Sequence, residues 1–174
     1  MKRVLSIAAL LLSCFASLSA ETPASPELKV LDRLAGWWRF EATTHEAEWT
    51  PEEKHATGTN LCTWSLGGRF LEEKGTDTEK NSHLRLYTYD TLQKDDHTWW
   101  FSSTGHVNDS AGQWDAEAKI FKWVSTLPSG QTVTSKHHFV KDNTVAWSVV
   151  VTDAAGKIYF HMEGKMFRLK ESKQ

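Results

Sequence analysis

Histidine is the residue type in this chain best suited to metal or haem chemistry, because neutral imidazole is a common ligand of transition metals. The chain has eight histidines, but no two show a helical zinc spacing and no cysteine recurs beside them. His137 and His138 are adjacent on an expected strand and must face opposite sides. His161 lies where some barrel-shaped haem proteins place an axial ligand, yet alternation puts it outside. We therefore expect no metal and no cofactor.

Hydrolysis needs a nucleophile and a base that converge in space. Ser110 is close in sequence to Asp109 and His106, but three near neighbours in one loop rarely form a triad. The sequence also shows no nucleophile elbow and no glycine-rich phosphate loop before a helix. We predict no catalytic residue and no enzymatic activity.

Tryptophan points instead to binding. The chain has nine tryptophans, a high number for a small domain. Aromatic side chains that line a cavity can stack on a flat or sugar-like ligand. The alternative is that they fill a wide core and cap its ends, so their positions in the fold decide their role.

One short helix is expected before the strands, over Pro26–Leu34. Ser25 is a suitable N-cap, Pro26 suits the first helical position, and Gly36 ends the helix. Its apolar face consists of Leu28, Leu31 and Leu34. Such a helix can plug one end of a barrel.

From Trp37 onward the hydrophobic period becomes two, and turn residues recur about every ten residues, as in all-β folds. We count about ten strands joined mostly by tight turns, which indicates an up-and-down antiparallel meander. Closure into a barrel removes the free edges of such a sheet. A two-sheet sandwich is the alternative.

The first and last strands should meet if the barrel closes. In the segment 157–169, the inward set is Ile158, Phe160, Met162, Gly164, Met166 and Arg168. Trp38 faces inward on the first strand, just after Gly36. An Arg168 guanidinium over the Trp38 indole would contribute roughly 0.5 to 2 kcal/mol.

The Gly-Gly pair at 67–68 predicts a two-residue hairpin between segments 60–66 and 69–75. Trp64 faces inward before the turn, and pairing across the turn directs Arg69 and Glu73 inward as well. Two open alternatives explain these charges. Either they pair in the lumen and touch a polar ligand group, or a bulge or rim position keeps them out.

A family resemblance covers nearly all of the chain after residue 20. The chain resembles the bacterial family called domain of unknown function 1579, and the most specific block is the run from Trp64 to Leu71. The matching segments are Leu31-x-x-Leu34-x-Gly36-x-Trp38, Cys62-x-Trp64-x-Leu66-Gly67-Gly68-Arg69-Phe70-Leu71, Tyr89-Asp90, Trp99-Trp100-Phe101 through Gly105, Gly112-x-Trp114-Asp115 and Gly164…Arg168. The resemblance implies a lipocalin-like, calycin-type barrel and implies no activity or catalytic residue.

The first twenty residues have the pattern of an export signal. Lys2 and Arg3 precede a short apolar run and then small residues, with cleavage after Ser19 or Ala20. The alternative is a lipoprotein signal that anchors the chain through Cys14. The remaining chain is about 150 residues, enough for one domain. We divide it into a linker and helix at 21–35, a barrel at 36–170 and a polar tail at 171–174.

Charge and cysteine content limit the partners further. The net charge of −2 gives no support for nucleic-acid binding, and no later segment is apolar enough to be a transmembrane helix. After signal removal only Cys62 remains, and its strand context predicts a buried thiol. We expect a bacterial periplasmic protein.

The sequence favours a carrier-type domain that binds a small, largely apolar ligand inside the barrel. The expected ligand-binding residues are Trp38, Trp64, Arg69, Phe160, Met162 and Met166, and Gly36, Trp38 and Arg168 form the structural signature. Arg69, or Arg168 if accessible, would meet an anionic head group. The alternative is a solidly packed envelope interaction domain without a ligand, and an uncharacterised enzyme or haem-binding barrel is a weaker one.

Overall fold

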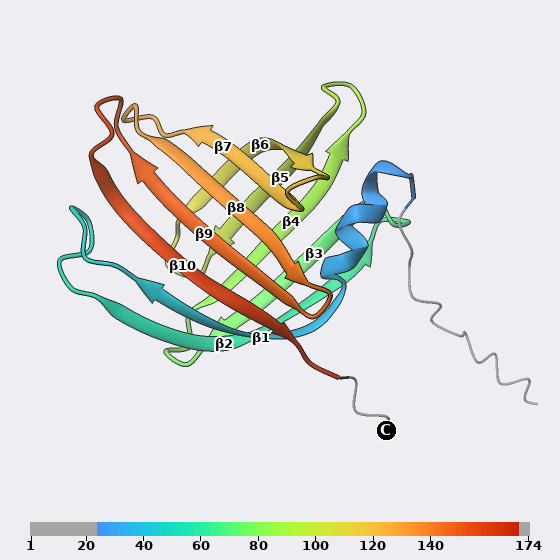
Figure 1. Cartoon of the computed structure of the whole chain (residues 1–174), viewed down its shortest axis with the longest axis horizontal. Coiled ribbons are helices and arrows are strands. Elements are labelled where there is room, and N and C mark those ends of the chain that lie inside the picture. Colours follow the sequence, from blue (N-terminus) through green and yellow to red (C-terminus); the bar gives the residue numbers. More distant parts are fainter. Residues whose placement is uncertain (1–23, 171–174) are drawn as a thin grey trace, which may run out of the picture.

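Ten antiparallel strands close into a barrel in the computed structural model, and a short helix lies at one end (Figure 1). The strands follow one another in sequence around the barrel, and β1 closes it by pairing with β10. Their bounds are β1 Gly36–Thr44, β2 Lys54–Ser65, β3 Phe70–Asp77, β4 Ser82–Asp90, β5 Asp95–Ser102, β6 Val107–Asp115, β7 Ile120–Thr126, β8 Thr132–Lys141, β9 Thr144–Thr152 and β10 Ile158–Arg168. The expected closed all-β barrel is confirmed, and the two-sheet sandwich is wrong.

The structure describes residues 24–170. The expected signal segment 1–20, the lipid-anchor alternative at Cys14 and the polar tail 171–174 lie outside these residues. Within the described range, no helix has both the length and the apolar character needed to cross a bilayer.

The helix is a 3₁₀ helix, η1 Glu27–Leu34. Its three leucines, at 28, 31 and 34, are all buried. A spacing of three residues matches the three residues per turn of a 3₁₀ helix, so these leucines form one row against the barrel. The helix begins one residue later than expected. Pro26 is its N-cap and no side chain caps it, so the expected capping by Ser25 is wrong.

The closing seam joins Trp38 on β1 to Arg168 on β10, as expected. The two residues are register partners, and Cζ of Arg168 lies 4.3 Å from the centroid of the Trp38 ring. Trp38 is completely buried, and its indole Nε1 donates a hydrogen bond to the carbonyl of Leu34 at 2.7 Å. The Trp38 hydrogen bond therefore attaches the β1–β10 seam to the end of η1, in addition to the pairing between the two strands.

Arg168 also holds the chain between η1 and β1. Its guanidinium donates hydrogen bonds to the carbonyls of Arg33 and Ala35. These carbonyls lie at the end of a helix, where backbone acceptors lack intrahelical partners. Gly36 follows with φ of +111°, and a Cβ there would lie 3.0 Å from Nη1 of Arg168. Both the backbone conformation and the close guanidinium favour glycine at position 36.

The turn between β2 and β3 differs from expectation. Ser65 pairs with Phe70, which leaves a four-residue turn instead of a two-residue turn. Leu66 and the two glycines after it all have positive φ, which lengthens the turn. Arg69 lies in this turn and is exposed, whereas Glu73 is buried inside the barrel. Of the two alternatives that the sequence left open, the inward position applies to Glu73 and the position outside the lumen applies to Arg69.

The two ends of the barrel interior differ in burial. At the helix end, inward side chains pack against the η1 leucines and are buried: Trp38, Cys62, Leu71, Tyr87, Phe121, Phe139, Val145 and Met166. Towards the other end, Val133 and Val151 are buried, whereas several larger inward side chains are only half-buried: Trp100, Phe160 and Met162, together with Phe40 and Trp147, which pack against the core cluster. The helix closes one end, and solvent reaches side chains inside the other.

Candidate functional site

A layer of polar side chains crosses the barrel interior beneath the half-buried end. Strand alternation turns these side chains inward, and the register places Glu73 on β3 directly opposite Arg85 on β4. The layer consists of Asn60, Glu73, His83, Arg85, Ser135 and His137, with Tyr87 and Trp123 beside it. Buried polar groups need hydrogen-bond partners, so the hydrogen bonds within the layer show which of its donors and acceptors remain unpaired.

Glu73 is fully engaged within this layer. Its Oε1 accepts from Asn60 Nδ2 at 2.9 Å and lies 3.1 Å from His83 Nε2, and its Oε2 accepts from the Tyr87 hydroxyl at 2.5 Å. Burial opposes its charge, but the hydrogen bond and charge of His83 and the charge of Arg85 lower the pKa of Glu73 to about 2. Glu73 is therefore a buried anion whose two oxygens already have donors.

Arg85 has only neutral direct partners. Its Nη1 lies 3.2 Å from Nε2 of His137, and its Nη2 donates to Ser135 Oγ at 3.4 Å. Among residues 24–170, no carboxylate forms an ion pair with it. Burial opposes its charge, yet Tyr87 and Glu73 raise the pKa of Arg85. The interior therefore contains a permanent cation that is not neutralised by direct contact.

His137 is a neutral imidazole with a defined proton position. Burial, followed by the charge of Arg85, lowers the pKa of His137 to about 3. Because a guanidinium can only donate, Nε2 of His137 must be the acceptor in its contact with Arg85. The ring proton is therefore assigned to Nδ1.

Three buried donors around this cation lack acceptors. They are Arg85 Nε, His137 Nδ1 and the indole Nε1 of Trp123, and no atom of the described chain accepts from them. The Trp123 and His137 rings are 5.3 Å apart between centroids, and Cζ of Arg85 lies 6.0 Å from the Trp123 centroid. A buried donor without a partner costs about 1 to 3 kcal/mol. Each of these three nitrogens is covered by neighbouring atoms, so an acceptor oxygen would reach them only after the side chains around them move apart.

Glycines in the interior wall let large side chains lie close to it. A Cβ at Gly58 would lie 2.5 Å from Cζ of Phe40, and one at Gly164 would lie 2.7 Å from Cζ2 of Trp147. These rings therefore occupy the space that wall side chains would take.

The predicted ligand-binding residues separate into two groups. Phe160 and Met162 are half-buried at the helix-free end of β10. Trp38 and Met166 are buried in the core at the helix end, and Trp64 donates to Asp32 of η1 at 2.9 Å. The remaining one, Arg69, is exposed in its turn. The structure thus brings only Phe160 and Met162 to the half-buried end.

Sequence reasoning missed Arg85, Trp123 and His137. Arg85 lies between Leu84 and Leu86, and alternation alone would have placed these leucines inside. The alignment of β3 with β4 locates Arg85. Glu73 and Arg85 are register partners, and register partners share a face of the sheet, so an inward Glu73 requires an inward Arg85.

Two surface pockets lie outside the barrel interior. One, of about 180 Å³, is at the helix end and is lined by residues that include Arg33, Phe139 and Arg168. The other, of about 360 Å³, lies on the outer face of β5 to β7. Neither one adjoins the polar layer.

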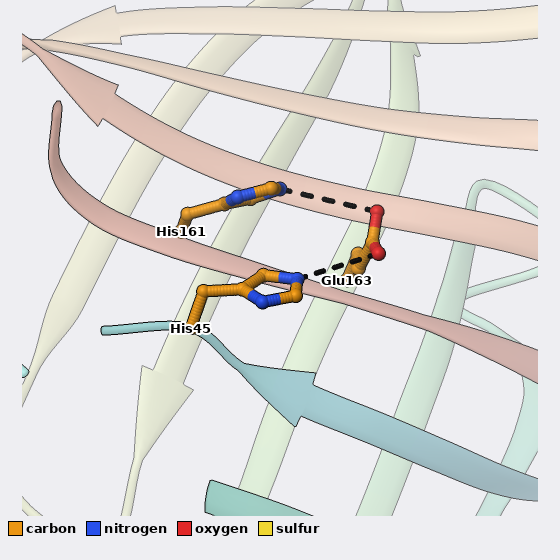
Figure 2. Close-up of side chains that lie close together, drawn as sticks. All are labelled: His45, His161 and Glu163. Atoms are coloured by element: carbon orange, nitrogen blue, oxygen red, sulfur yellow. Dashed lines mark hydrogen bonds and ion pairs between the residues drawn. The ribbon is translucent and has the colours of Figure 1, made fainter. Parts of the chain in front are cut away.

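A second group of side chains could hold a metal ion. His45, His161 and Glu163 converge on the outer surface near the helix-free end (Figure 2). The expected absence of a metal site came from comparing residues close in sequence, and positions 45 and 161 are not. The alternation argument correctly placed His161 outside.

A family model described as "Protein of unknown function (DUF1579)" matches residues 23–168. The chain belongs to the DUF1579 family. A comparison of this DUF1579 protein with curated proteins finds no match.

Solved structures share the fold at low sequence identity. The chain is similar to Rv2717c from M. tuberculosis, with a TM-score of 0.63, 10% identity, and coverage of 84% of this chain and 99% of that one. It is also similar to the S-type phycobiliprotein lyase CPES from Guillardia theta, with a TM-score of 0.58, 10% identity, and coverage of 83% and 93%. At this identity the likeness shows the fold alone.

Proposed function

We propose that this DUF1579 protein is an exported carrier that binds one small molecule with an apolar body and an anionic, oxygen-bearing head group. The observation that carries the proposal is the cluster of three buried donors without acceptors, on Arg85, Trp123 and His137. A carboxylate head would accept from these donors once the side chains that cover them move apart to admit it.

The charge of the head group follows from the charges of the polar layer. Glu73 already has three hydrogen-bond partners, so both of its oxygens are occupied by donors of the protein. Arg85 contacts a neutral imidazole and a hydroxyl. A carboxylate bound here would form a charge-assisted hydrogen bond with Arg85, which is about twice as strong as a neutral one.

The apolar body would lie in the half-buried end of the barrel. Its walls include the aromatic rings of Phe40, Trp100 and Trp147 and the adaptable side chain of Met162. Aromatic and apolar side chains beside a few polar groups are the kind of lining that small-molecule sites have. The lipocalin-like architecture that we infer, a barrel open at one end, suits such a carrier.

Export to the periplasm is supported by sequence alone. Lys2 and Arg3, the short apolar run after them and the small residues before position 20 form the pattern of a signal peptide. Mass spectrometry of the mature N-terminus tests this part, because a diacylated Cys14 would indicate lipid anchoring instead.

Calorimetric titration with matched ligands tests the binding site. The ligands are a medium-chain fatty acid and the alcohol of the same chain length. We expect the acid to bind at least tenfold more tightly at neutral pH. In Arg85→Gln the acid should lose this advantage while the alcohol keeps its affinity. Arg39→Gln is the matched control, because Arg39 is an exposed arginine on the outer face of β1.

Two further measurements keep the test decisive. Trp123→Phe removes a single donor from the cluster and preserves the aromatic ring, so it should weaken acid binding without unfolding the barrel. Equal affinity of acid and alcohol in the wild type would overturn the anionic head group. If neither ligand binds, and native mass spectrometry of protein purified from its own host shows no bound molecule, the interaction-domain alternative is favoured.

A further inference from the structure

Two imidazoles and a carboxylate meet on the outer wall of the barrel (Figure 2). His45 Nε2 lies 3.3 Å from Glu163 Oε1, and His161 Nε2 lies 3.9 Å from Glu163 Oε2. One ligand atom from each of the three residues lies within 4.8 Å of the other two. Each carboxylate oxygen thus faces a different ring.

Barrel closure creates this arrangement. The β1–β10 ladder ends with the pair Thr44 and Met162, and the backbone amide of His45 continues it by donating to the carbonyl of His161 at 2.8 Å. Glu163 lies two residues beyond His161 on the same strand, so both side chains leave the same face. Hydrogen bonds between these two segments therefore hold the backbone that carries the three side chains.

The donor set and its dimensions suit a transition-metal ion. Zinc binds histidine nitrogen and carboxylate oxygen at about 2.0 to 2.2 Å with tetrahedral geometry, which places neighbouring donors about 3.3 to 3.5 Å apart. The distance between His45 and Glu163 already has this value, and the one between His161 and Glu163 needs a small side-chain rotation. Two histidines and a carboxylate are a known combination for Zn²⁺.

Partial exposure leaves a position for water. The side chains of His45 and His161 are 32% and 31% exposed. An ion held by three protein groups there would take solvent as its fourth ligand.

A second carboxylate orients one of the rings. Nδ1 of His45, the nitrogen that points away from Glu163, lies 3.2 Å from Glu53 Oε2. The other oxygen of Glu53 lies 3.4 Å from His55 Nε2. Histidine ligands of metals almost always bond through the second nitrogen to a carboxylate, a carbonyl or water, which fixes the tautomer. Glu53 is placed to perform this role for His45.

We propose that His45, His161 and Glu163 form a binding site for one divalent transition-metal ion of the Zn²⁺ type. The ion links the segment after β1 to β10 at the closing seam and stabilises the barrel there. Glu53 is a positioning residue that orients His45. The site is separate from the polar layer inside the barrel, so it does not depend on the proposed carrier function.

Calorimetric titration of chelator-treated, tag-free protein with ZnCl₂ tests the proposal. We expect one Zn²⁺ per chain, with a rise in melting temperature on saturation because the ligand binds only the folded state. His161→Ala and Glu163→Gln should each weaken binding by more than tenfold. Glu53→Gln should weaken it by about tenfold, as found for residues that orient metal ligands.

His138→Ala is the matched control. His138 is also an exposed histidine on an outer strand face, on β8, and it should leave the affinity unchanged. Co²⁺ replaces Zn²⁺ as a spectroscopic probe, and its visible bands should disappear in His45→Ala. All variants lie on the surface, and circular dichroism verifies their folding. Zn²⁺ binding that is absent, or equal in wild type and His161→Ala, would show that the cluster is an ordinary surface ion-pair group.

Discussion

Replacement of Arg168 by methionine should destabilise the barrel more than any other loss of a single surface charge. Methionine keeps an unbranched apolar stem beside Trp38 but removes the guanidinium. The change removes a cation–π contact at 4.3 Å and two hydrogen bonds to the carbonyls of Arg33 and Ala35. Both the seam and the end of η1 then lose an anchor.

The size of the effect follows from these contacts. A partly sheltered cation–π contact contributes about 0.5 to 2 kcal/mol, and hydrogen bonds to a charged group contribute about 1.5 to 3 kcal/mol each. Because Arg168 is only half-buried, we take the lower ends and expect a loss of about 3.5 kcal/mol. In a domain of this size that corresponds to a fall in melting temperature of about 7 to 14 °C.

Arg39→Met provides the matched comparison. Arg39 also lies over an aromatic ring, with Cζ 4.2 Å from the centroid of Phe167, and it pairs with Glu41. Its side chain is 49% exposed, so the loss should stay below about 1 kcal/mol.

Urea unfolding monitored by tryptophan fluorescence measures both variants, with unchanged slopes as the condition for comparing free energies. A double-mutant cycle with Trp38→Leu should assign about 0.5 to 2 kcal/mol to the stacking itself. Equal losses in Arg168→Met and Arg39→Met would refute the reasoning, because the seam contact would then contribute no more than an exposed one.

Three other predictions concern the interior. The pKa of Glu73 is about 2 in the folded state, below its value in the unfolded chain. Its stabilisation, up to about 3 kcal/mol, should be complete above pH 5 and decline towards pH 2, and Glu73→Gln should flatten this part of the stability profile in urea titrations. His137 is neutral when folded, with a pKa of about 3, so the unfolded chain binds more protons below about pH 6.5. Stability should fall from there towards pH 3, and His137→Phe should remove that slope in the same titrations. Burial raises the pKa of the Cys62 thiol, so iodoacetamide should label it only after unfolding; rapid labelling of the native protein in peptide mass spectra would contradict its sealed position.

Much of the fold could be predicted because it depends on local patterns. The period of two, the regular turn residues and the inward set of β10 gave the strands and their faces. The leucines at 28, 31 and 34 gave the helix, although their spacing suits a 3₁₀ helix as well as an α-helix. The turn at 66–69 was less predictable, because three successive residues with positive φ lengthen it beyond the two-residue form that Gly-Gly favours.

The candidate sites were harder to predict because both depend on pairs of distant residues. The sequence offered Arg69 or Arg168 as a cation for the ligand and left the inward position of Arg69 open, whereas the register places Arg85 inside the barrel. Short-range motif searches compare neighbouring histidines and cannot pair His45 with His161.

The sequence by itself determined the strands, the inward alternation of each strand and the contact of Trp38 with Arg168, because side-chain alternation and edge removal act on any sheet of this pattern. Only the tertiary structure decided which end remains half-buried, which polar side chains lie beside Arg85 and which side chains meet across the seam. The physical reason is that hydrophobic patterning fixes the face of each residue, whereas its neighbours on other strands depend on register and barrel closure.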